Sequence, residues 1–197
     1  DVGLQQLGLT SLVNAKKPTP LDEAKNIIYT LRHVYYDAIG EMYAYIKGSV
    51  GSKQFENHDI VKLGFWPGGD RDGNPFVTAD ITRDVMNELR LTLMKCYYND
   101  LKGLVHKLTF KDLEKFIDKV KIFKVHFATI DIRQDHSMHT KVMVEVLKKN
   151  SLIKEDLSEL TEERLIDILL HENLQLNAND YEEEIVKDTI KNILQLQ

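Results

Sequence analysis

Apolar residues recur at helical spacing along most of this chain. In residues 16–47 they return every three or four positions, which predicts a helix of about seven turns. Thr19 is suited to cap this helix, because its hydroxyl can accept a hydrogen bond in the first turn while Asp22 reciprocates. Gly48, Gly51 and Ser52 are expected to end it.

The same spacing predicts further helices. Thr78 is a candidate cap for a second long helix, with Asp80 in its first turn. The apolar stripe of this helix consists of Ile81, Val85, Leu89, Leu93 and Cys96. Shorter helices are predicted over residues 109–121, 137–149, 161–172 and 180–196. The last of these is expected to be capped by Asp180, with Glu183 three residues later.

One segment breaks this helical pattern. Residues 122–132, IFKVHFATIDI, are rich in β-branched and aromatic residues and carry little charge before Asp131. Such a sequence is typical of a strand buried on both faces. No other segment is a convincing partner, so the rest of a sheet or barrel is expected to lie outside these residues. The predicted fold class is therefore mainly α, with long helices plus one or few buried strands.

The composition limits the classes of function. Of 197 residues, 43% are hydrophobic and 29% charged, which favours a packed core over disorder. The net charge of −5 argues against nucleic-acid binding, since phosphate contacts need a basic surface. No apolar run is long enough to cross a membrane, and the one cysteine, Cys96, suits a reducing compartment. The chain begins with Asp rather than Met, so we expect an internal piece of a longer protein.

Residues 65–78, FWPGGDRDGNPFVT, combine glycine, proline and alternating charges. The run DRDGN resembles the start of a calcium loop, but Pro75 and Ile81 stand where that loop needs glycine and glutamate. Neither GxGxxG nor GxxxxGKS/T occurs, which argues against a phosphate loop. From composition alone, a structural turn is favoured, in which Asp and Arg pair with each other and with backbone amides, and Trp66 belongs to the core.

A second candidate site lies at the end of the predicted strand, in IDIRQDHSMH. Arg133 emerges from an apolar strand, and a buried guanidinium must be paired with a bound carboxylate or phosphate, or within the protein. Asp131, Asp135 or the loop acids could provide an internal partner, and the residues alone leave both interpretations open. His136 and His139 would share a helix face, but without a third ligand they favour surface residues over a metal site.

Three motifs, in the same order, resemble the phosphoenolpyruvate carboxylase family. GFWPGGDRDGNPFVTADITRDV resembles that family's GSWMGGDRDGNPxVTxxxTRDV, and ATIDIRQDHSMHT resembles its LDIRQESxxHT. KPTPLDEA resembles its RTKPTPxDEA. The resemblance extends from about Lys16 to about Thr140.

The resemblance implies an enzyme that carboxylates phosphoenolpyruvate with bicarbonate, giving oxaloacetate and phosphate, and that uses Mg²⁺ or Mn²⁺. It implies helices around an α/β barrel, with residues 122–133 as a barrel strand. Arg133 matches the catalytic arginine that holds the substrate phosphate, and Trp66 matches the tryptophan beside the substrate's methylene group. The loop that supports this site would consist of Gly68, Gly69, Asp70, Arg71, Asp72, Gly73 and Asn74. In this loop Arg71 is expected to form an ionic network with the two aspartates, none of them a metal ligand.

The resemblance further implies a cytoplasmic homotetramer for the complete enzyme. The family's TAHPTE histidine motif, its metal-binding acids, its mobile glycine loop and further substrate arginines are not found here. Residues 1–197 are therefore expected to be a single internal fragment that contributes substrate-site residues but is inactive alone. The stretch between the two long motifs is shorter than usual, and Pro67, Asp135, His136 and Met138 depart from the usual residues. The alternative is a non-catalytic helical regulatory or scaffolding module that retained the motif loop.

Overall fold

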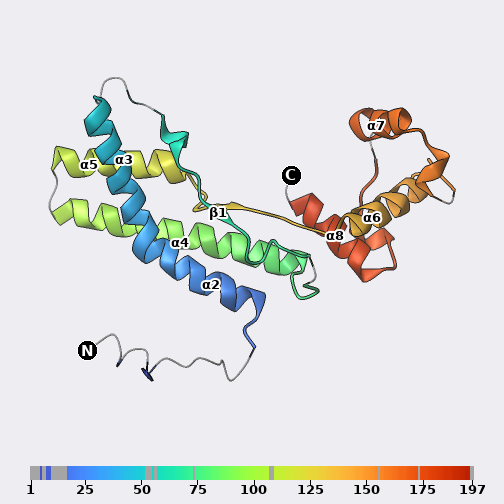
Figure 1. The fold of residues 1–197 in the computed structure, drawn as a ribbon, viewed down its shortest axis with the longest axis horizontal. Coiled ribbons are helices and arrows are strands. Elements are labelled where there is room, and N and C mark those ends of the chain that lie inside the picture. The colour runs from blue at the N-terminus through green and yellow to red at the C-terminus, as the bar shows by residue number, and fades with distance from the viewer. Residues whose placement is uncertain are drawn as a thin grey trace.

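The computed structural model describes residues 17–51, 55, 57–72, 74–106, 109–154, 156–172 and 174–195, together with Gln5, Gly8 and Leu9. This part of the chain is mainly helical, as predicted, and its helices form two groups (Figure 1). The first group contains α2 (Pro20–Thr30), α3 (Tyr36–Val50), α4 (Ala79–His106) and α5 (Phe110–Phe123). The second group contains α6 (His136–Lys149), α7 (Glu162–His171) and α8 (Glu184–Gln195). The two short strands are β1 (Gly64–Phe65) and β2 (Thr129–Ile130).

The first long helix begins as the sequence predicts. The Thr19 hydroxyl accepts from the Asp22 N–H at 3.2 Å, and the Asp22 carboxylate accepts from the Thr19 N–H at 3.0 Å, which completes a capping box. The helix continues through a π-helical segment, η1 (Leu31–Tyr35), into α3. Gly48 does not end it, because a glycine inside a helix costs only about 1 kcal/mol. It ends at Gly51, whose φ is 98°.

α4 provides the apolar face on which the first group packs. The Thr78 hydroxyl accepts from the Ile81 N–H at 3.4 Å at the start of this helix, and Val85 and Leu93 are fully buried along it. The core cluster consists of Ala24, Ile28, Leu31, Tyr36, Ile39, Phe65, Val85, Leu89, Leu93, Cys96, Phe123 and Phe127. Because this cluster contains Phe65 of β1 and a phenylalanine shortly before β2, hydrophobic burial fixes both strands against the same helix.

The predicted strand at residues 122–132 is largely replaced by other structure. α5 extends to Phe123, a turn follows, and only Thr129–Ile130 are extended. A partner lies within the chain, because β1 pairs with β2 in parallel, Gly64 opposite Thr129 and Phe65 opposite Ile130. The expectation of a strand without a partner here is therefore wrong. Burial on both faces is also wrong, since the apolar residues of this segment instead complete the end of α5 and the core cluster, and Thr129 is exposed.

The second group has apolar clusters of its own. One of them joins α6 to α8 and consists of Val142, Val146, Ala178, Tyr181, Val186 and Ile190. Asp180 does not cap α8, because it belongs to a separate turn, the short 3-10 helix η4 (Ala178–Asp180). The Val186 N–H instead donates to the Glu183 carbonyl at 3.1 Å, and α8 begins at Glu184.

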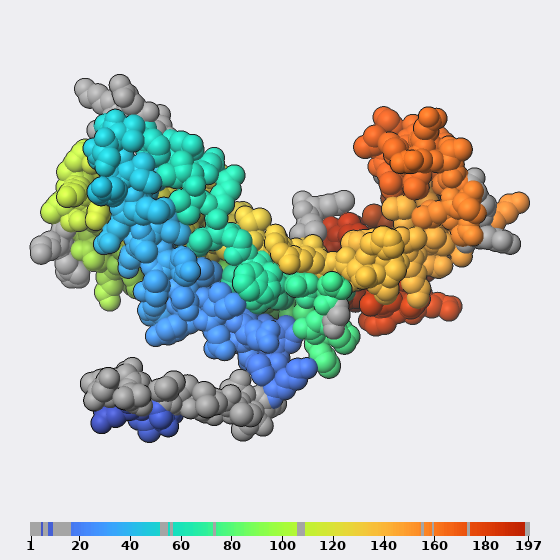
Figure 2. Space-filling view, in the orientation of Figure 1, coloured from blue at the N-terminus to red at the C-terminus, as the bar shows by residue number. Residues whose placement is uncertain are grey.

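Figure 2 shows the two groups as separate masses joined by a narrower middle part. α8 packs against both α6 and α4, so it is the element of the second group that reaches back to the first. Within the part of the chain that the structure describes, no helix is long and apolar enough to cross a membrane.

Candidate functional site

Two close backbone approaches shape the glycine-rich loop. Gly68 has a φ of +79°, and a Cβ there would lie 2.6 Å from Cγ2 of Val85 in α4. A Cβ on Gly69 would lie 2.2 Å from the carbonyl oxygen of Asp131. Neither position has room for a side chain, so the two glycines let the loop lie directly against α4 and the end of β2.

Backbone hydrogen bonds join the two long motifs side by side. The Asp131 N–H donates to the Phe65 carbonyl at 2.8 Å, which continues the ladder of β1 and β2. Farther along, the Arg133 N–H donates to the Gly69 carbonyl at 3.0 Å, and the Arg71 N–H donates to the Arg133 carbonyl at 2.8 Å. Two segments far apart in the sequence therefore share one edge at the carboxyl ends of parallel strands, where α/β folds commonly place active sites.

Arg133, the predicted substrate arginine, is not buried as expected. Its side chain is 59% exposed and pairs with Asp131, with 3.1 Å between Nη2 and Oδ2. In the described residues no ion pair joins it to Asp135, whose carboxylate instead caps α6 by accepting from the Ser137 N–H at 2.8 Å. Hydrogen bonds from the Ser137 hydroxyl and N–H lower the pKa of Asp135. Because more than half of this side chain is exposed, donors of Arg133 that do not face Asp131 are accessible to a ligand.

Arg71 is buried, and its ion pair is not the predicted one. Its guanidinium pairs with Asp188 of α8, and no described contact joins it to the carboxylates of Asp70 or Asp72. Nε of Arg71 also donates to the Val77 carbonyl at 3.1 Å. The side chains of Arg71 and Asp188 are only 6% and 16% exposed, so removal of either charge would leave the other in a poorly solvated position.

The other polar residues of the loop hold the turn. Oδ1 of Asp70 accepts from the Asp72 N–H at 3.2 Å, and Oδ1 of Asn74 accepts from the Phe76 N–H at 3.2 Å. Local bonds of this kind are the reason that Asp and Asn are frequent in turns. The structural turn considered from composition is thus correct in its bonds to backbone amides. Its predicted pairing of Asp with Arg within the loop is wrong. Gly73 lies outside the described residues.

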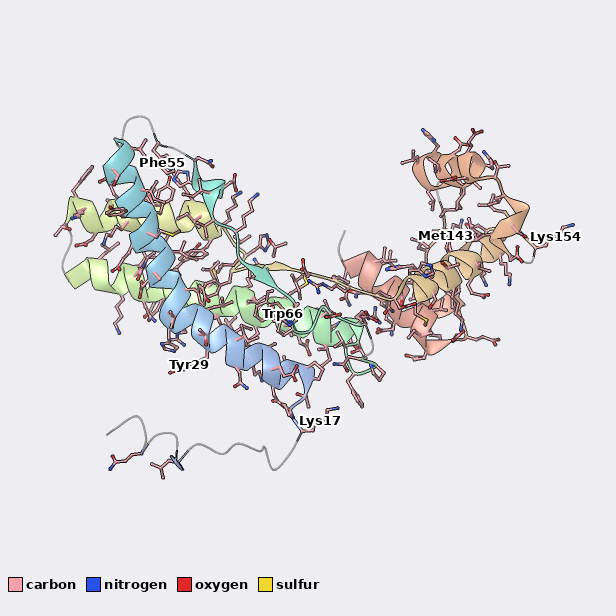
Figure 3. The ribbon with its side chains drawn as sticks, in the orientation of Figure 1. Lys17, Tyr29, Phe55, Trp66, Met143 and Lys154 are labelled. Carbon is pink, nitrogen blue, oxygen red and sulfur yellow. The ribbon has the colours of Figure 1, made fainter. Side chains whose placement is uncertain are left out.

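Trp66 is 56% exposed, so the alternative of a core aromatic is wrong. It directly follows β1 and lies in the middle part of the molecule (Figure 3). Its carbonyl accepts from the N–H groups of Gly69 and Asp70 at 2.8 and 3.0 Å, which fixes the backbone that carries the indole. The exposed ring offers an apolar surface beside the strand ends, where a ligand could cover it.

The described residues contain no group of three His, Cys, Asp or Glu side chains that could hold a metal ion. Asp131 and Asp188, the acids of the two arginine pairs, are already engaged with cations. His136 and His139 are exposed at the start of α6, as expected for surface histidines. Because Mg²⁺ and Mn²⁺ favour carboxylate and other oxygen ligands, these residues do not fit the metal that the resemblance implies.

No sequence motif points to Asp188. It lies 117 positions from Arg71, on a helix with no resemblance to either long motif. The one available signal is an acid between Val186 and Ile190, two residues of the buried face of α8. An acid at the margin of an apolar face is too common to identify a partner for a particular arginine.

At the strand ends, the exposed guanidinium of Arg133 and the exposed indole of Trp66 belong to two segments that backbone hydrogen bonds hold together. The family model for phosphoenolpyruvate carboxylase matches residues 3–113 and 107–195. The chain therefore belongs to the phosphoenolpyruvate carboxylase family.

Several curated relatives are phosphoenolpyruvate carboxylases. The one from Shewanella loihica is 33% identical over 113 residues, which are 55% of this chain and 13% of the relative. The one from Aeromonas hydrophila subsp. hydrophila is 34% identical over 107 residues, or 52% of this chain and 12% of the relative. The one from Actinobacillus pleuropneumoniae serotype 5b is 31% identical over 126 residues, or 59% and 14%. The matched part of the chain thus spans only 12–14% of the length of these relatives.

Proposed function

We propose that this chain is part of a phosphoenolpyruvate carboxylase, which joins phosphoenolpyruvate to bicarbonate and gives oxaloacetate and phosphate. The observation that best supports this is the pairing of the two long motifs at one strand edge, with Trp66 and Arg133 both exposed. Burial of Phe65 and Phe127 accounts for the pairing of the strands, whereas the exposure of both motif side chains at the strand ends is what a ligand site requires. The family membership supplies the reaction class.

In this proposal Arg133 binds the phosphate group of the substrate. A guanidinium remains protonated at any working pH, and its fork of N–H donors matches phosphate oxygens. The same donors would stabilise the negative charge on the phosphate as it leaves. Asp131, 3.1 Å away, would hold the guanidinium in place while leaving other donors accessible.

Trp66 would cover the apolar part of the substrate. The methylene carbon of phosphoenolpyruvate forms the new bond to the carboxyl carbon, and an adjacent indole would keep water away from it. The loop from Gly68 to Asn74 would act through its backbone. The Gly69 carbonyl and the Arg71 N–H, which bond Arg133 on its two sides, would fix the substrate arginine relative to the indole.

The metal and the proton-handling histidine are assigned to parts of the enzyme outside these residues. This assignment is supported by the poor fit of the described acids to Mg²⁺ or Mn²⁺. When bound, a divalent ion would supply charge stabilisation to substrate oxygens. The present residues are assigned only the binding and orientation of phosphoenolpyruvate, so the chain by itself is proposed to be an inactive internal fragment.

Three further features belong to the proposal. The complete enzyme is a homotetramer, as the resemblance implies. It is cytoplasmic, and the free thiol of Cys96, buried in the first core, is compatible with a reducing compartment. The chain is shortened between its two long motifs, and the family match in two pieces that overlap at residues 107–113 is compatible with this.

The test compares wild type with Arg133→Ala in the complete enzyme, by bicarbonate- and Mg²⁺-dependent formation of oxaloacetate. Loss of a charge-assisted phosphate contact is expected to lower kcat/KM about a hundredfold, equivalent to about 2–3 kcal/mol. Arg164→Ala is the matched control, because Arg164 lies outside the three motifs, its side chain is 49% exposed, and it pairs with Glu172 at 3.4 Å. The control is expected to stay within about twofold of wild type.

The outcomes distinguish a carboxylase that uses Arg133 from a carboxylase that does not, and from a non-catalytic module. A loss confined to Arg133→Ala supports both the activity and the role of Arg133. Near-normal kcat/KM in folded Arg133→Ala means that the role assigned to this residue is wrong. A folded wild-type enzyme without activity would instead favour the non-catalytic helical module.

A further inference from the structure

Asp188 contacts the site loop and the start of α4 at once. It is the fifth residue of α8, and its side chain is 16% exposed. Its carboxylate accepts from the Arg71 guanidinium and from the Ala79 N–H, the latter at 2.9 and 3.1 Å to the two oxygens. Ala79 is the first residue of α4, so its N–H has no partner within its own helix. One carboxylate of the second helical group thus binds both the site loop and the first residue of α4.

The contact with Arg71 leads directly to the substrate arginine. The Arg71 N–H donates to the Arg133 carbonyl at 2.8 Å, and the Arg133 N–H donates to the Gly69 carbonyl at 3.0 Å. The Arg133 side chain is more than half exposed and pairs with Asp131, so the position of its guanidinium depends on that pair and on where the two backbone bonds hold Arg133. A cavity of about 280 Å³, lined by loop residues, Gln134 and α8, lies beside the Arg71–Asp188 pair. Packing alone therefore does not set the spacing at this junction.

The geometry points to Asp188 as a positioning residue for Arg133, a role that rests on the proposed function. Asp188 does not belong to the strand edge and acts through Arg71. Without its charge, the buried guanidinium loses its ionic partner and must shift to find water or another acceptor. A shift that reaches the backbone of Arg71 moves its N–H, and with it the carbonyl of Arg133 to which that N–H is bonded.

The test is Asp188→Asn in the complete enzyme. Asparagine keeps the size of the side chain and an acceptor for the Ala79 N–H, but removes the charge that faces Arg71. Because misplacement of a binding group by about 1 Å can cost about a hundredfold, kcat/KM is expected to fall about ten- to a hundredfold. The fall should come mainly from a raised KM for phosphoenolpyruvate, since Arg133 holds the phosphate before and during the reaction.

Glu184→Gln is the matched control. Glu184 lies on the same helix and borders the same cavity, but its side chain is 82% exposed and its ionic neighbour is Lys187 at 3.9 Å. This variant loses the same charge and is expected to stay within about twofold of wild type. A merely structural role of Asp188 would reduce the fraction of folded enzyme and so lower the apparent kcat, with KM unchanged.

Amide hydrogen exchange gives a second readout that does not require activity. The N–H groups of Arg71 and Arg133 are expected to exchange faster in Asp188→Asn than in wild type or Glu184→Gln. An unchanged KM in an active enzyme, or unchanged exchange at both amides, would overturn the positioning role. If the wild type lacks carboxylase activity, the proposed function fails, and the exchange result still decides whether Asp188 holds Arg133 in place.

Discussion

Replacement of Gly69 by alanine probes the contact on which the whole strand edge depends. The added methyl group would lie 2.2 Å from the carbonyl oxygen of Asp131 and 3.0 Å from Cγ1 of Ile130. Normal contact between a carbon and an oxygen needs about 3.4 Å, so the loop and β2 must separate by about 1 Å. The obstacle is backbone rather than a flexible side chain, so no rotamer change can relieve it.

The cost can be worked out from the same contacts. Overpacking of this kind costs about 1–3 kcal/mol. Separation also weakens the two bonds that join the loop to Arg133, at 2.8 and 3.0 Å, each contributing about 1 kcal/mol. Alanine restricts the unfolded chain, which offsets about 0.4–1 kcal/mol. The net loss in the free energy of unfolding is therefore about 2–4 kcal/mol.

Urea unfolding of the 197-residue chain, followed by far-UV circular dichroism, measures this difference. Gly64→Ala is the matched control, because Gly64 lies on the same pair of strands and a Cβ there meets nothing within 4 Å. The control is expected to be neutral or slightly stabilising, since alanine is favoured over glycine inside a strand. Equal stability of the two variants would refute the reasoning that the close approach of Gly69 holds the motifs together.

Two further predictions concern pH and activity. Burial, together with a hydrogen bond donated to Asp100 at 2.9 Å, raises the pKa of Tyr36 above its ordinary value, so the phenol stays neutral in the folded chain while the unfolded chain ionises near pH 10. The contribution of Tyr36 to the free energy of unfolding is therefore complete below about pH 10 and falls as the pH rises further. Tyr36→Phe is expected to reduce the decrease of this free energy with pH in unfolding experiments at pH 9–11. An unchanged decrease would contradict the prediction. The isolated 197-residue chain is expected to form no oxaloacetate from phosphoenolpyruvate and bicarbonate, and measurable turnover by the purified chain would contradict its assignment as a fragment of the site.

The helices could be predicted because their signals are local. The capping box of Thr19 and Asp22 and the apolar stripe of α4 depend only on near neighbours in the sequence. The partner strand could not be predicted, because Gly64–Phe65 is too short to show alternation. Its pairing is decided by burial of Phe65 and Phe127 in one cluster, which is a property of the assembled core.

The same distinction applies to the candidate site. The motifs locate Trp66 and Arg133. The sequence suggested a core position for Trp66 and a buried guanidinium for Arg133, whereas the structure exposes both side chains. The segment that precedes Arg133 carries little charge before Asp131, which favoured burial. Exposure depends instead on which elements cover the end of β2, and the apolar pattern of a strand carries no information about its neighbours.

The buried guanidinium of Arg71 finds its acceptor on a distant helix rather than among its neighbours in the sequence. A buried guanidinium needs an acceptor, and the adjacent Asp70 and Asp72 were the nearest candidates. Neither carboxylate pairs with Arg71, because Asp70 accepts from a backbone N–H within the loop and Asp72 is exposed. The acceptor must then come from a distant element, and Asp188 on α8 provides it. For this reason a helix outside both long motifs contacts the site loop, and substitution of Asp188, unlike that of exposed residues of α8, is expected to affect substrate binding by changing the position of Arg133.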